Sequence, residues 1–527
     1  MALQPLLLEG RWQPPRHPAG SFRAVSPFTG TPLDEEYPIS IFDEVERALR
    51  AGVLASEELP SLAVEKTADF FDLFARLIEE RADAIVQIAH RETGLPEEPR
   101  LRNVELPRTT GQLRMAAEAV RERSWCRAVI DSRAGIRSMY GPLGGPVAVF
   151  GPGNFPLAFN AVAGGDFAAA LAAGNPVIAK GHPLIPGTTR LLAETAFEAV
   201  TRAGLPPATV QMLYHVERDS GPSLVSHSLL AGTAFTGSRS AGLRLKEAAD
   251  RAGKPIYLEM SSLNPLVLLP GALEERPGEI ARELFESCAL GAGQFCTKPG
   301  LVLLIRGRAA DDFLAKVTEL FRSYPPGVLS GRTVLDRLAS SVESLRRHGA
   351  EILAGGRVAA GEGFRYANTL LRVAAATFSN APQAFQAEAF GTASLVILAE
   401  DIEELCGALS HLEGSLAGSI YSQRGNFDEA AYSRVEARLR VKVGRLLNDR
   451  MPTGVAVSPA MNHGGPYPAT GHPGFTAVGI PASLLRFAAL RCYDGVRPHR
   501  LPPELKDRNP NGRMWRLIDG EWTRRDL

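Results

Sequence analysis

The chain has 527 residues, 45% of them hydrophobic, so it can bury large cores and is too long for one ordinary domain. Lys plus Arg and Asp plus Glu number 58 each, which gives a formal net charge of zero. No excess of positive charge indicates a nucleic acid or an anionic membrane as partner. We therefore expect the partner to be a small molecule.

The five cysteines are odd in number, widely scattered and without the spacing of metal ligands. This pattern argues against a disulfide framework and against a zinc site. The N-terminal residues are apolar but lack a basic start, a long apolar core and a small-residue cleavage site. No run approaches the length of a membrane span. We expect a soluble, cytoplasmic protein without a metal site.

Short β-rich runs alternate with helical stretches from about residue 145. Strands are predicted at 147–150, 176–179, 210–214 and 231–235, and helices at 188–203 and 241–252. The rhythm resumes with a strand at 265–269, a helix near 280–290, a strand at 301–305 and a helix near 311–321. Such alternation is typical of parallel sheets covered by helices. It predicts an α/β fold with two successive α/β units.

The strand at 147–150 runs into a Gly/Pro turn whose polar member is Asn154. The side-chain amide of Asn154 could direct an N–H at an oxyanion that develops during a reaction. It could equally cap the helix that follows. This segment alone leaves both roles open.

A second turn leads from the strand at 231–235 into a helix through Thr236, Gly237 and Ser238. Free N–H groups at the start of a helix can hold a phosphate. No G-x-G-x-x-G fingerprint opens the first α/β unit, so a standard dinucleotide site is not indicated. Any strand-to-helix turn can use Gly-Ser, and the motif alone is therefore weak.

Glu259 and Cys296 are the candidate base and nucleophile. Glu259 ends an apolar run where a strand feeds a loop, and Cys296 lies among small and polar residues that leave its sulfur approachable. A thiol has an ordinary pKa of about 8.5 and attacks as the thiolate, so it needs amide dipoles, a base or a cationic cofactor ring nearby. A cysteine in a Gly-rich turn is often only a small buried hydrophobic residue. The presence of Glu259 and Asn154 favours the nucleophile.

Together the three segments resemble the aldehyde dehydrogenase superfamily. Its strand-Asn-Phe-Pro turn, Glu-Leu-Gly-Gly-like segment and Gly-Gln-x-Cys loop occur in the order of Asn154, Glu259 and Cys296, at closely similar separations. The resemblance covers nearly the whole chain. It implies that Cys296 is the nucleophile, Glu259 the general base and Asn154 an oxyanion donor. It also implies an aldehyde dehydrogenase-like fold, with two doubly wound parallel-sheet domains and a small β ribbon for oligomerisation.

The resemblance further implies a nicotinamide cofactor. Lys180 ends a strand where the family places a Lys-Pro-Ser-Glu type sequence against the adenosine ribose, but Pro183, with His182 beside it, replaces the usual acid. A carboxylate there would repel a 2′-phosphate, whereas Lys180 would attract one, so NADP is predicted over NAD. The segment 387–391 resembles the family's Glu-x-Phe-Gly stretch, although a loop with a packed Phe is the alternative. The residues predicted to bind the cofactor are Lys180, His182, Thr236, Gly237, Ser238, Glu388 and Phe390.

The same resemblance divides the chain into domains. Residues 1–126 and 146–262 are predicted to form the cofactor-binding domain, and residues 263–480 the catalytic domain. Residues 127–145 and 481–500 are predicted to form an oligomerisation arm, and 501–527 a C-terminal extension. The arm implies a homo-oligomer, either a dimer or a tetramer.

Three departures place the chain off the main branch of the family. Ser261 and Ser262 replace Gly-Gly after the general base, Gly153 replaces an aromatic residue before the catalytic Asn, and the loop 462–470 is atypical. That loop and the segment 180–183 resemble the subgroup of bacterial α-ketoglutaric semialdehyde dehydrogenases and an NADP-linked fatty aldehyde dehydrogenase. The predicted reaction is oxidation of an aldehyde to a carboxylate through a cysteine thioester, with 2,5-dioxopentanoate as the expected substrate.

Three alternatives remain open. A medium- or long-chain fatty aldehyde could be the substrate, because the same subgroup includes such an enzyme. A non-catalytic relative could keep the fold for binding, although the retention of Asn154, Glu259 and Cys296 argues against it. A reductase that makes thioesters with coenzyme A would have little need of a base at residue 259.

Overall fold

The first α/β unit is built on a seven-stranded sheet in the order β12-β11-β7-β8-β9-β1-β2, in a computed structural model that describes residues 3–527. Five strands run parallel: β7 (Val147–Phe150), β8 (Val177–Lys180), β9 (Val210–Leu213), β11 (Gly232–Thr236) and β12 (Ile256–Glu259). At one edge, β1 (Leu6–Leu8) and β2 (Arg11–Gln13) pair antiparallel. The strands predicted between residues 147 and 235 are confirmed to within one residue, whereas the antiparallel edge lies before the alternating pattern begins and was not predicted.

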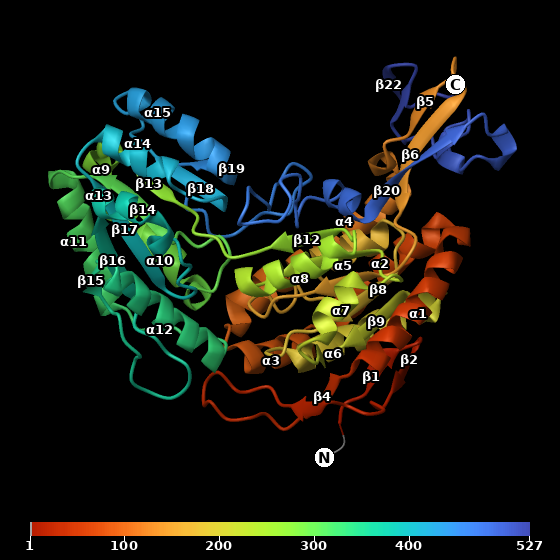
Figure 1. The fold of residues 1–527 in the computed structure, drawn as a ribbon, viewed down its shortest axis with the longest axis horizontal. Helices are drawn as coiled ribbons and strands as arrows, with labels where there is room; N and C mark the ends of the chain where they lie inside the picture. Colours follow the sequence, from red (N-terminus) through yellow and green to blue (C-terminus); the bar gives the residue numbers. More distant parts are fainter. Residues whose placement is uncertain (1–2) are drawn as a thin grey trace.

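Helices cover both faces of this sheet (Figure 1). They are α1 (Phe42–Glu58), α2 (Val64–Glu80), α3 (Ala82–Thr93), α4 (Leu106–Glu122), α5 (Gly165–Ala172), α6 (Pro186–Ala203), α7 (Ser220–Ser226) and α8 (Arg239–Arg251). A small sheet of β3 (Gly20–Phe22), β4 (Tyr37–Ser40) and β10 (His215–Val216) lies beside them.

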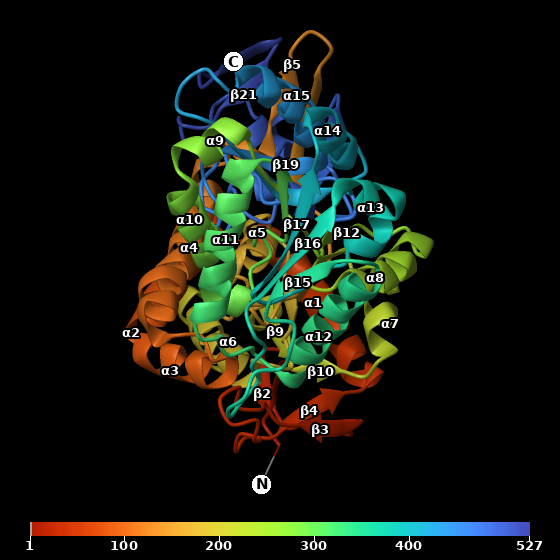
Figure 2. The same cartoon turned by 90° about the vertical axis from the view of Figure 1, so that its left-hand side faces the viewer.

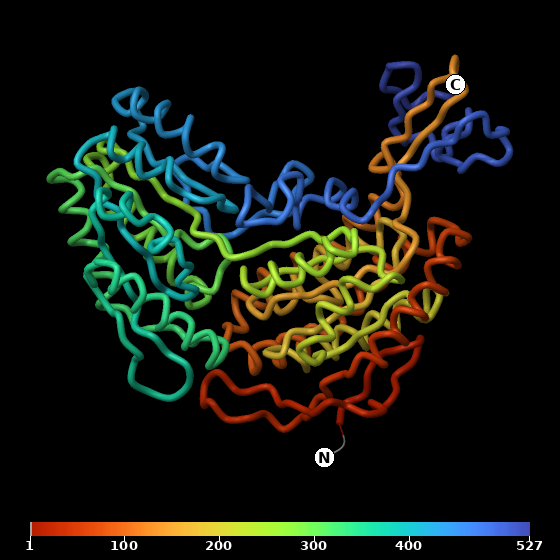
Figure 3. The backbone as a smooth tube through the Cα atoms, viewed as in Figure 1, coloured from red at the N-terminus to blue at the C-terminus, as the bar shows by residue number. Residues whose placement is uncertain are grey.

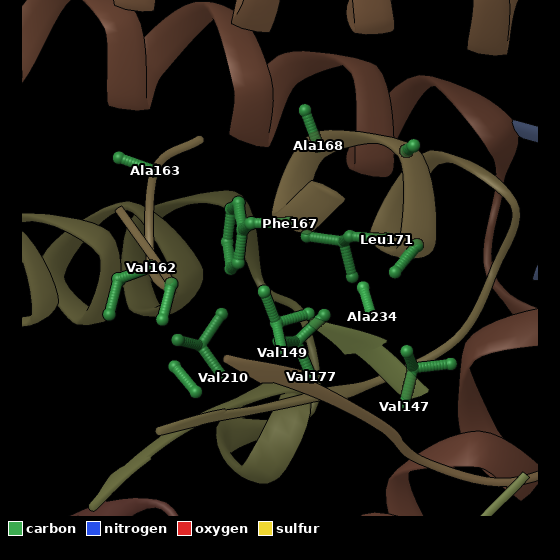
Figure 4. Close-up of a cluster of buried hydrophobic side chains, with 14 of the residues drawn as sticks. Val147, Val149, Val162, Ala163, Phe167, Ala168, Leu171, Val177, Val210 and Ala234 are labelled. Atoms are coloured by element: carbon green, nitrogen blue, oxygen red, sulfur yellow. The ribbon is translucent and has the colours of Figure 1, made fainter. Parts of the chain in front are cut away.

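The strands are continuous apolar runs because both of their faces are buried. All four residues of β7 are buried, and α5 is buried along its whole length. In Figure 4, Phe167 and Leu171 of α5 lie over Val149 and Val177 of the sheet. The small residues of α5 let this helix lie close to the strands, so the carboxyl ends of β7 and β8 are held on a rigid support.

The second α/β unit has a seven-stranded sheet in the order β15-β16-β17-β14-β13-β18-β19. Its strands are β13 (Leu266–Leu268), β14 (Leu301–Ile305), β15 (Glu351–Ala354), β16 (Thr369–Ala374), β17 (Ala393–Ala399), β18 (Ser415–Tyr421) and β19 (Val443–Asn448), all parallel to their neighbours except β15. The predicted strand at 301–305 is confirmed.

Two groups of helices enclose this second sheet. Figure 2 shows α10 (Pro277–Ala289) and α11 (Arg308–Ser323) on one side of the sheet and α12 (Arg332–Arg347) and α13 (Ala375–Asn380) on the other. Two separate clusters of buried apolar side chains correspond to these two sides. The remaining helices are α9 (Pro270–Glu275), α14 (Ile402–Ser410) and α15 (Glu429–Leu439). None of the helices in residues 3–527 has both the length and the apolar composition needed to cross a membrane.

A ribbon sheet projects from the first unit and carries the C-terminus (Figure 1). Its order is β20-β6-β5-β21-β22, from β5 (Val129–Asp131), β6 (Ile136–Pro142), β20 (Ala488–Asp494), β21 (Arg516–Ile518) and β22 (Glu521–Thr523). The two segments predicted as the arm supply β5, β6 and β20. The residues predicted as a separate extension supply β21, which pairs parallel with β5, and β22.

Between β19 and the ribbon the chain runs from the second unit back along the first (Figure 3). Residues 449–481 form no helix and no named strand. They are tied to the end of β12 by a bridge between Glu259 and Thr470 and by a hydrogen bond from Met260 N to Ala469 O of 2.8 Å. This return brings the loop 462–470 to the carboxyl edge of the first sheet.

Candidate active site

A cavity of about 380 Å³ lies between the two α/β units. It is formed by the loops after β7, β8, β11 and β12 on one side and by the Cys296 loop, α12 and residues 388–390 on the other. The carboxyl ends of parallel strands are where ligands bind in open α/β sheets. Nine of the ten predicted site residues line the cavity: Asn154, His182, Thr236, Gly237, Ser238, Glu259, Cys296, Glu388 and Phe390. Lys180 is not among the lining residues.

Cys296 and Glu259 are brought together with a third residue, His463. The Cys296 Sγ lies 3.4 Å from His463 Nε2, and this nitrogen lies 3.1 Å from Glu259 Oε1. Potential ligand atoms of the three side chains all lie within 4.8 Å of one another. The other carboxylate oxygen, Glu259 Oε2, is buried and has no hydrogen-bond partner within residues 3–527. One imidazole nitrogen therefore contacts both groups: without a proton it accepts from the thiol, and once protonated it donates to the carboxylate, whose second oxygen has no partner among the described residues.

His463 had no predicted role. It lies in the loop 462–470, which the sequence singled out only as a departure from the family. Its backbone N–H donates to Thr476 Oγ1 at 3.0 Å, and the side chain is buried against Phe159, with ring centroids 5.8 Å apart. This loop is held in place by pairing with the end of β12, about 200 residues earlier in the chain. A contact over that separation cannot be predicted from a local sequence pattern.

The surroundings of Cys296 favour the neutral thiol in the absence of ligands. Burial, followed by the negative charge of the nearby Glu259, raises the pKa of Cys296 well above its ordinary value. The Arg108 guanidinium acts in the opposite direction. Each effect follows the usual rule that low polarity and nearby negative charge penalise a thiolate while positive charge favours it.

Asn154 contacts the loop of the nucleophile. Its Nδ2 donates to Gln294 O at 2.9 Å, and since the amide carries two N–H groups, a second remains for another acceptor. The next α-helix begins at Gly165 with Gly164 at its N-cap position. Asn154 therefore caps no α-helix, and the alternative role considered for it is excluded.

Two residues fix the backbone of the Cys296 loop. Asn264 Nδ2 donates to Cys296 O at 2.8 Å and to Lys298 O at 2.9 Å. Asn264 itself has a φ of +49°, a left-handed conformation that Asn tolerates better than most residues. Gly293 has a φ of +73°, and a Cβ there would lie 2.1 Å from the carbonyl carbon of Gly391. Only glycine allows this close approach of the loop to residues 388–391.

The cavity offers separate groups for the parts of a dinucleotide. Ser238 occupies the N-cap position of α8 without a side-chain cap, which leaves backbone N–H groups that suit a phosphate. Glu388 is a half-buried carboxylate whose pKa is raised by burial, with a Ser261 hydrogen bond opposing this. Arg337 of α12 lines both this cavity and an adjoining one of about 540 Å³, and it was not predicted. An anion site, a carboxylate acceptor and a cation thus fit a pyrophosphate-linked nucleotide.

His182 and Gly153 contact each other. A Cβ at residue 153 would lie 2.8 Å from His182 Nδ1 and 3.3 Å from Leu184 Cδ1, so two departures from the family share one physical cause. Burial, followed by the charges of Lys180, His215 and Arg337, lowers the pKa of His182 to about 3. Its Nδ1 accepts from Leu184 N at 3.2 Å, so the neutral ring carries its proton on Nε2. Burial also lowers the pKa of Lys180 to about 8.

Comparisons with known proteins identify relatives in sequence and in fold. The chain matches the sequence model of the aldehyde dehydrogenase family over residues 12–465. It is 38% identical to alpha-ketoglutaric semialdehyde dehydrogenase 2 of Azospirillum brasilense, across 95% of this chain and 96% of that protein. It is 36% identical to alpha-ketoglutaric semialdehyde dehydrogenase of Acinetobacter baylyi, across 91% and 92%. A crystal structure of a mutant of aldehyde dehydrogenase C from Pseudomonas syringae, with NAD+ and octanal, shares the fold at a TM-score of 0.80 and 21% identity, across 95% and 98%.

Proposed function

Because this chain belongs to the aldehyde dehydrogenase family and is an oxidoreductase that acts on aldehydes with a nicotinamide cofactor, we propose that its substrate is 2,5-dioxopentanoate and its product 2-oxoglutarate. The name of the two relatives and their coverage of over nine-tenths of the chain support this substrate. The observation that carries the chemistry is the contact of Cys296 with His463, and of His463 with Glu259.

The reaction begins with removal of the thiol proton. His463 Nε2 is the nearest acceptor, at 3.4 Å from Cys296 Sγ. The thiolate then attacks the aldehyde carbon, and the second N–H of the Asn154 amide and the backbone N–H of Cys296 hold the oxyanion. A donor of this kind commonly contributes about 10²–10³ in rate.

The cofactor, when bound, supplies a hydride acceptor. Loss of hydride from the tetrahedral carbon leaves the acyl group on Cys296 as a thioester. Glu259 holds its Oε1 against His463, so the free Oε2 accepts a proton from the water that attacks the thioester carbon. Collapse of that adduct breaks the C–S bond and releases the Cys296 thiolate and the carboxylic acid, which loses its proton to water to give the carboxylate.

NADP is the proposed cofactor. In place of the family's acid, the segment after β8 carries Pro183, with His182 beside it, and Lys180 and Arg337 add positive charge near His182. No carboxylate of this segment would repel a 2′-phosphate. Direct titration should show tighter binding of NADP than NAD, and Lys180→Ala should weaken NADP more than NAD. Tighter binding of NAD by the unaltered protein would refute the proposal.

The chemistry has its own test. Cys296→Ala should abolish aldehyde oxidation, whereas Glu259→Gln should allow thioester formation and slow its hydrolysis, as measured by rapid quench. Normal thioester breakdown in Glu259→Gln would show that another group is the base.

The substrate is tested by a panel of aldehydes. Short dicarboxylic semialdehydes should exceed neutral aldehydes of equal length in kcat/KM. If hexanal or a longer alkanal instead had a kcat/KM about tenfold higher, the difference would correspond to about 1.4 kcal/mol in transition-state stabilisation. The fatty aldehyde function would then replace this proposal.

The domain division, a homo-oligomeric state and a cytoplasmic location are proposed as well. The two seven-stranded sheets support the two predicted α/β domains, and the ribbon, with β20 at one edge, supports association of two or more copies. Five free cysteines suit a reducing compartment. Light scattering of the purified protein tests the oligomer directly.

A further inference from the structure

We propose that Arg108, on α4, binds the distal carboxylate of the substrate. This inference rests on the proposed function, because it names the residue that would recognise a semialdehyde by the charged end opposite its aldehyde.

Only one of the three nitrogens in the Arg108 guanidinium has a hydrogen-bond partner among the described residues. Its Nη1 donates to Val455 O at 2.9 Å, which fixes the orientation of the group. Its Nε and Nη2 are buried and have no hydrogen-bond partner in the described part of the chain. These two nitrogens lie on the same edge of the guanidinium, and that edge matches a carboxylate through two parallel N–H···O bonds.

Residues 3–527 supply no carboxylate for these two nitrogens. Glu105, one turn earlier, is already engaged: one oxygen pairs with Arg100 and the other accepts from the backbone N–H groups of Leu157 and Ala158. Burial lowers the pKa of Arg108, with the charge of Glu105 opposing this effect. A half-buried cation with two buried, unpaired donors is unfavourable, and an anionic ligand would satisfy both.

Aromatic side chains connect Arg108 with the surroundings of the nucleophile. Its Cζ is 5.1 Å from the centroid of the Phe159 ring, and that ring packs against His463. Phe155 packs against Phe295, which directly precedes Cys296, with ring centroids 5.0 Å apart. The charge of Arg108 is close enough to oppose the raised pKa of the Cys296 thiol. An apolar wall with a cation beyond it suits a substrate whose methylene groups separate an aldehyde from a carboxylate.

Two other arginines near the site, the buried Arg100 and the half-buried Arg445, have both Nη atoms hydrogen-bonded and provide a contrast. Arg100 pairs with Glu105 and donates to Asn154 O, while Arg445 donates to Gly454 O and Pro452 O. Of these three arginines, Arg108 alone has the two-nitrogen edge of its guanidinium open.

The test compares two aldehydes of equal chain length, 5-oxopentanoate and pentanal, in the full-length enzyme with saturating cofactor. The readout is the ratio of their kcat/KM values. Arg108→Met removes the charge and Arg108→Lys keeps it without the planar edge. Because Arg108 also influences Cys296, both aldehydes lose rate when its charge is removed, and the ratio cancels this shared loss. Arg114→Met, on the same helix and paired with Glu79 at the surface, is the matched control.

We expect a high ratio in the unaltered enzyme and in Arg114→Met. Arg108→Met should lower the ratio about 30-fold, mainly because weaker binding of the carboxylate substrate raises its KM, and Arg108→Lys should lower it by less. A high ratio that survives Arg108→Met would overturn this inference while leaving the proposed substrate intact. A ratio near one in the unaltered enzyme would overturn the proposed substrate itself. If Arg108→Met does not fold, Arg108→Lys is the deciding variant. An unchanged ratio of the two kcat/KM values in Arg108→Lys would also contradict the proposal.

Discussion

Removing the charge of Glu259 should make Cys296 more reactive in the enzyme without ligands. Glu259 and Cys296 offer atoms within 4.8 Å of each other, and the carboxylate raises the pKa of the thiol. Two unit charges at 4.8 Å interact by about 0.9 kcal/mol in water and by about 3.5 kcal/mol at an effective dielectric constant of about 20. Glu259→Gln should therefore lower the pKa of Cys296 and raise its thiolate fraction at neutral pH by about 4-fold to about 300-fold.

The assay is alkylation by iodoacetamide as a function of pH, with the labelled cysteine identified by mass spectrometry. A Cys492→Ser background removes the exposed thiol, and the other three cysteines are buried. Because alkylation follows the thiolate, the rate profile of Glu259→Gln should move to lower pH. Glu388→Gln is the control, since Glu388 raises the pKa of Cys296 less than Glu259 does.

An unchanged or slower alkylation in Glu259→Gln would refute this reasoning. Such a result would mean that Glu259 takes the thiol proton in the resting enzyme, so that its removal deprives Cys296 of a base. The same result would leave His463 without a role in the first step of the proposed mechanism.

Three further results are expected. Gly153→Trp should destabilise the protein by about 1–3 kcal/mol, because the new side chain overlaps His182, and adding His182→Gly should restore much of the melting temperature; no recovery in the double variant would contradict the contact. Asn264→Ala should be about 1 kcal/mol less stable than Asn264→Gly by calorimetry, since both lose the same hydrogen bonds but only alanine strains at a φ of +49°; equal stability would count against backbone strain. Burial raises the pKa of Glu92 to about 7 from an ordinary value of 4.5, so the folded protein keeps a proton that the unfolded chain loses. The stability contributed by Glu92 should fall by about 1.4 kcal/mol per pH unit as pH rises from about 4.5 to 7, and urea unfolding of Glu92→Gln should lack this slope.

The sequence predicted the elements that are encoded locally. The strands at 147–150 and 301–305 are apolar runs bounded by turn residues, and both have the predicted bounds. Cys296, Glu259 and Asn154 were found because each stands in a short recognisable segment. Their meeting in one cavity followed from the order of those segments within a known fold.

The residues that were missed act through contacts between distant parts of the chain. His463 reaches Cys296 across 167 positions, and Arg108 donates to Val455 across 347. Neither His463 nor Arg108 belongs to a sequence motif that indicates a chemical role. An arginine on an amphipathic helix is usually expected to face solvent. The strands β21 and β22 were not predicted, because they are three residues long and, unlike the equally short β13, are not wholly apolar and buried.

The contact between Gly153 and His182 constrains the order in which this branch of the family could have arisen. A large side chain at residue 153 and the imidazole at residue 182 would compete for the same space. We expect a lineage that began with an aromatic residue at 153 to have replaced it by a small one before accepting a histidine at 182. In the reverse order, the intermediate would carry both an aromatic residue at 153 and a histidine at 182, and the two side chains would overlap. Ancestral reconstruction should therefore recover proteins with a small residue at 153 and no histidine at 182, and none with the opposite pair.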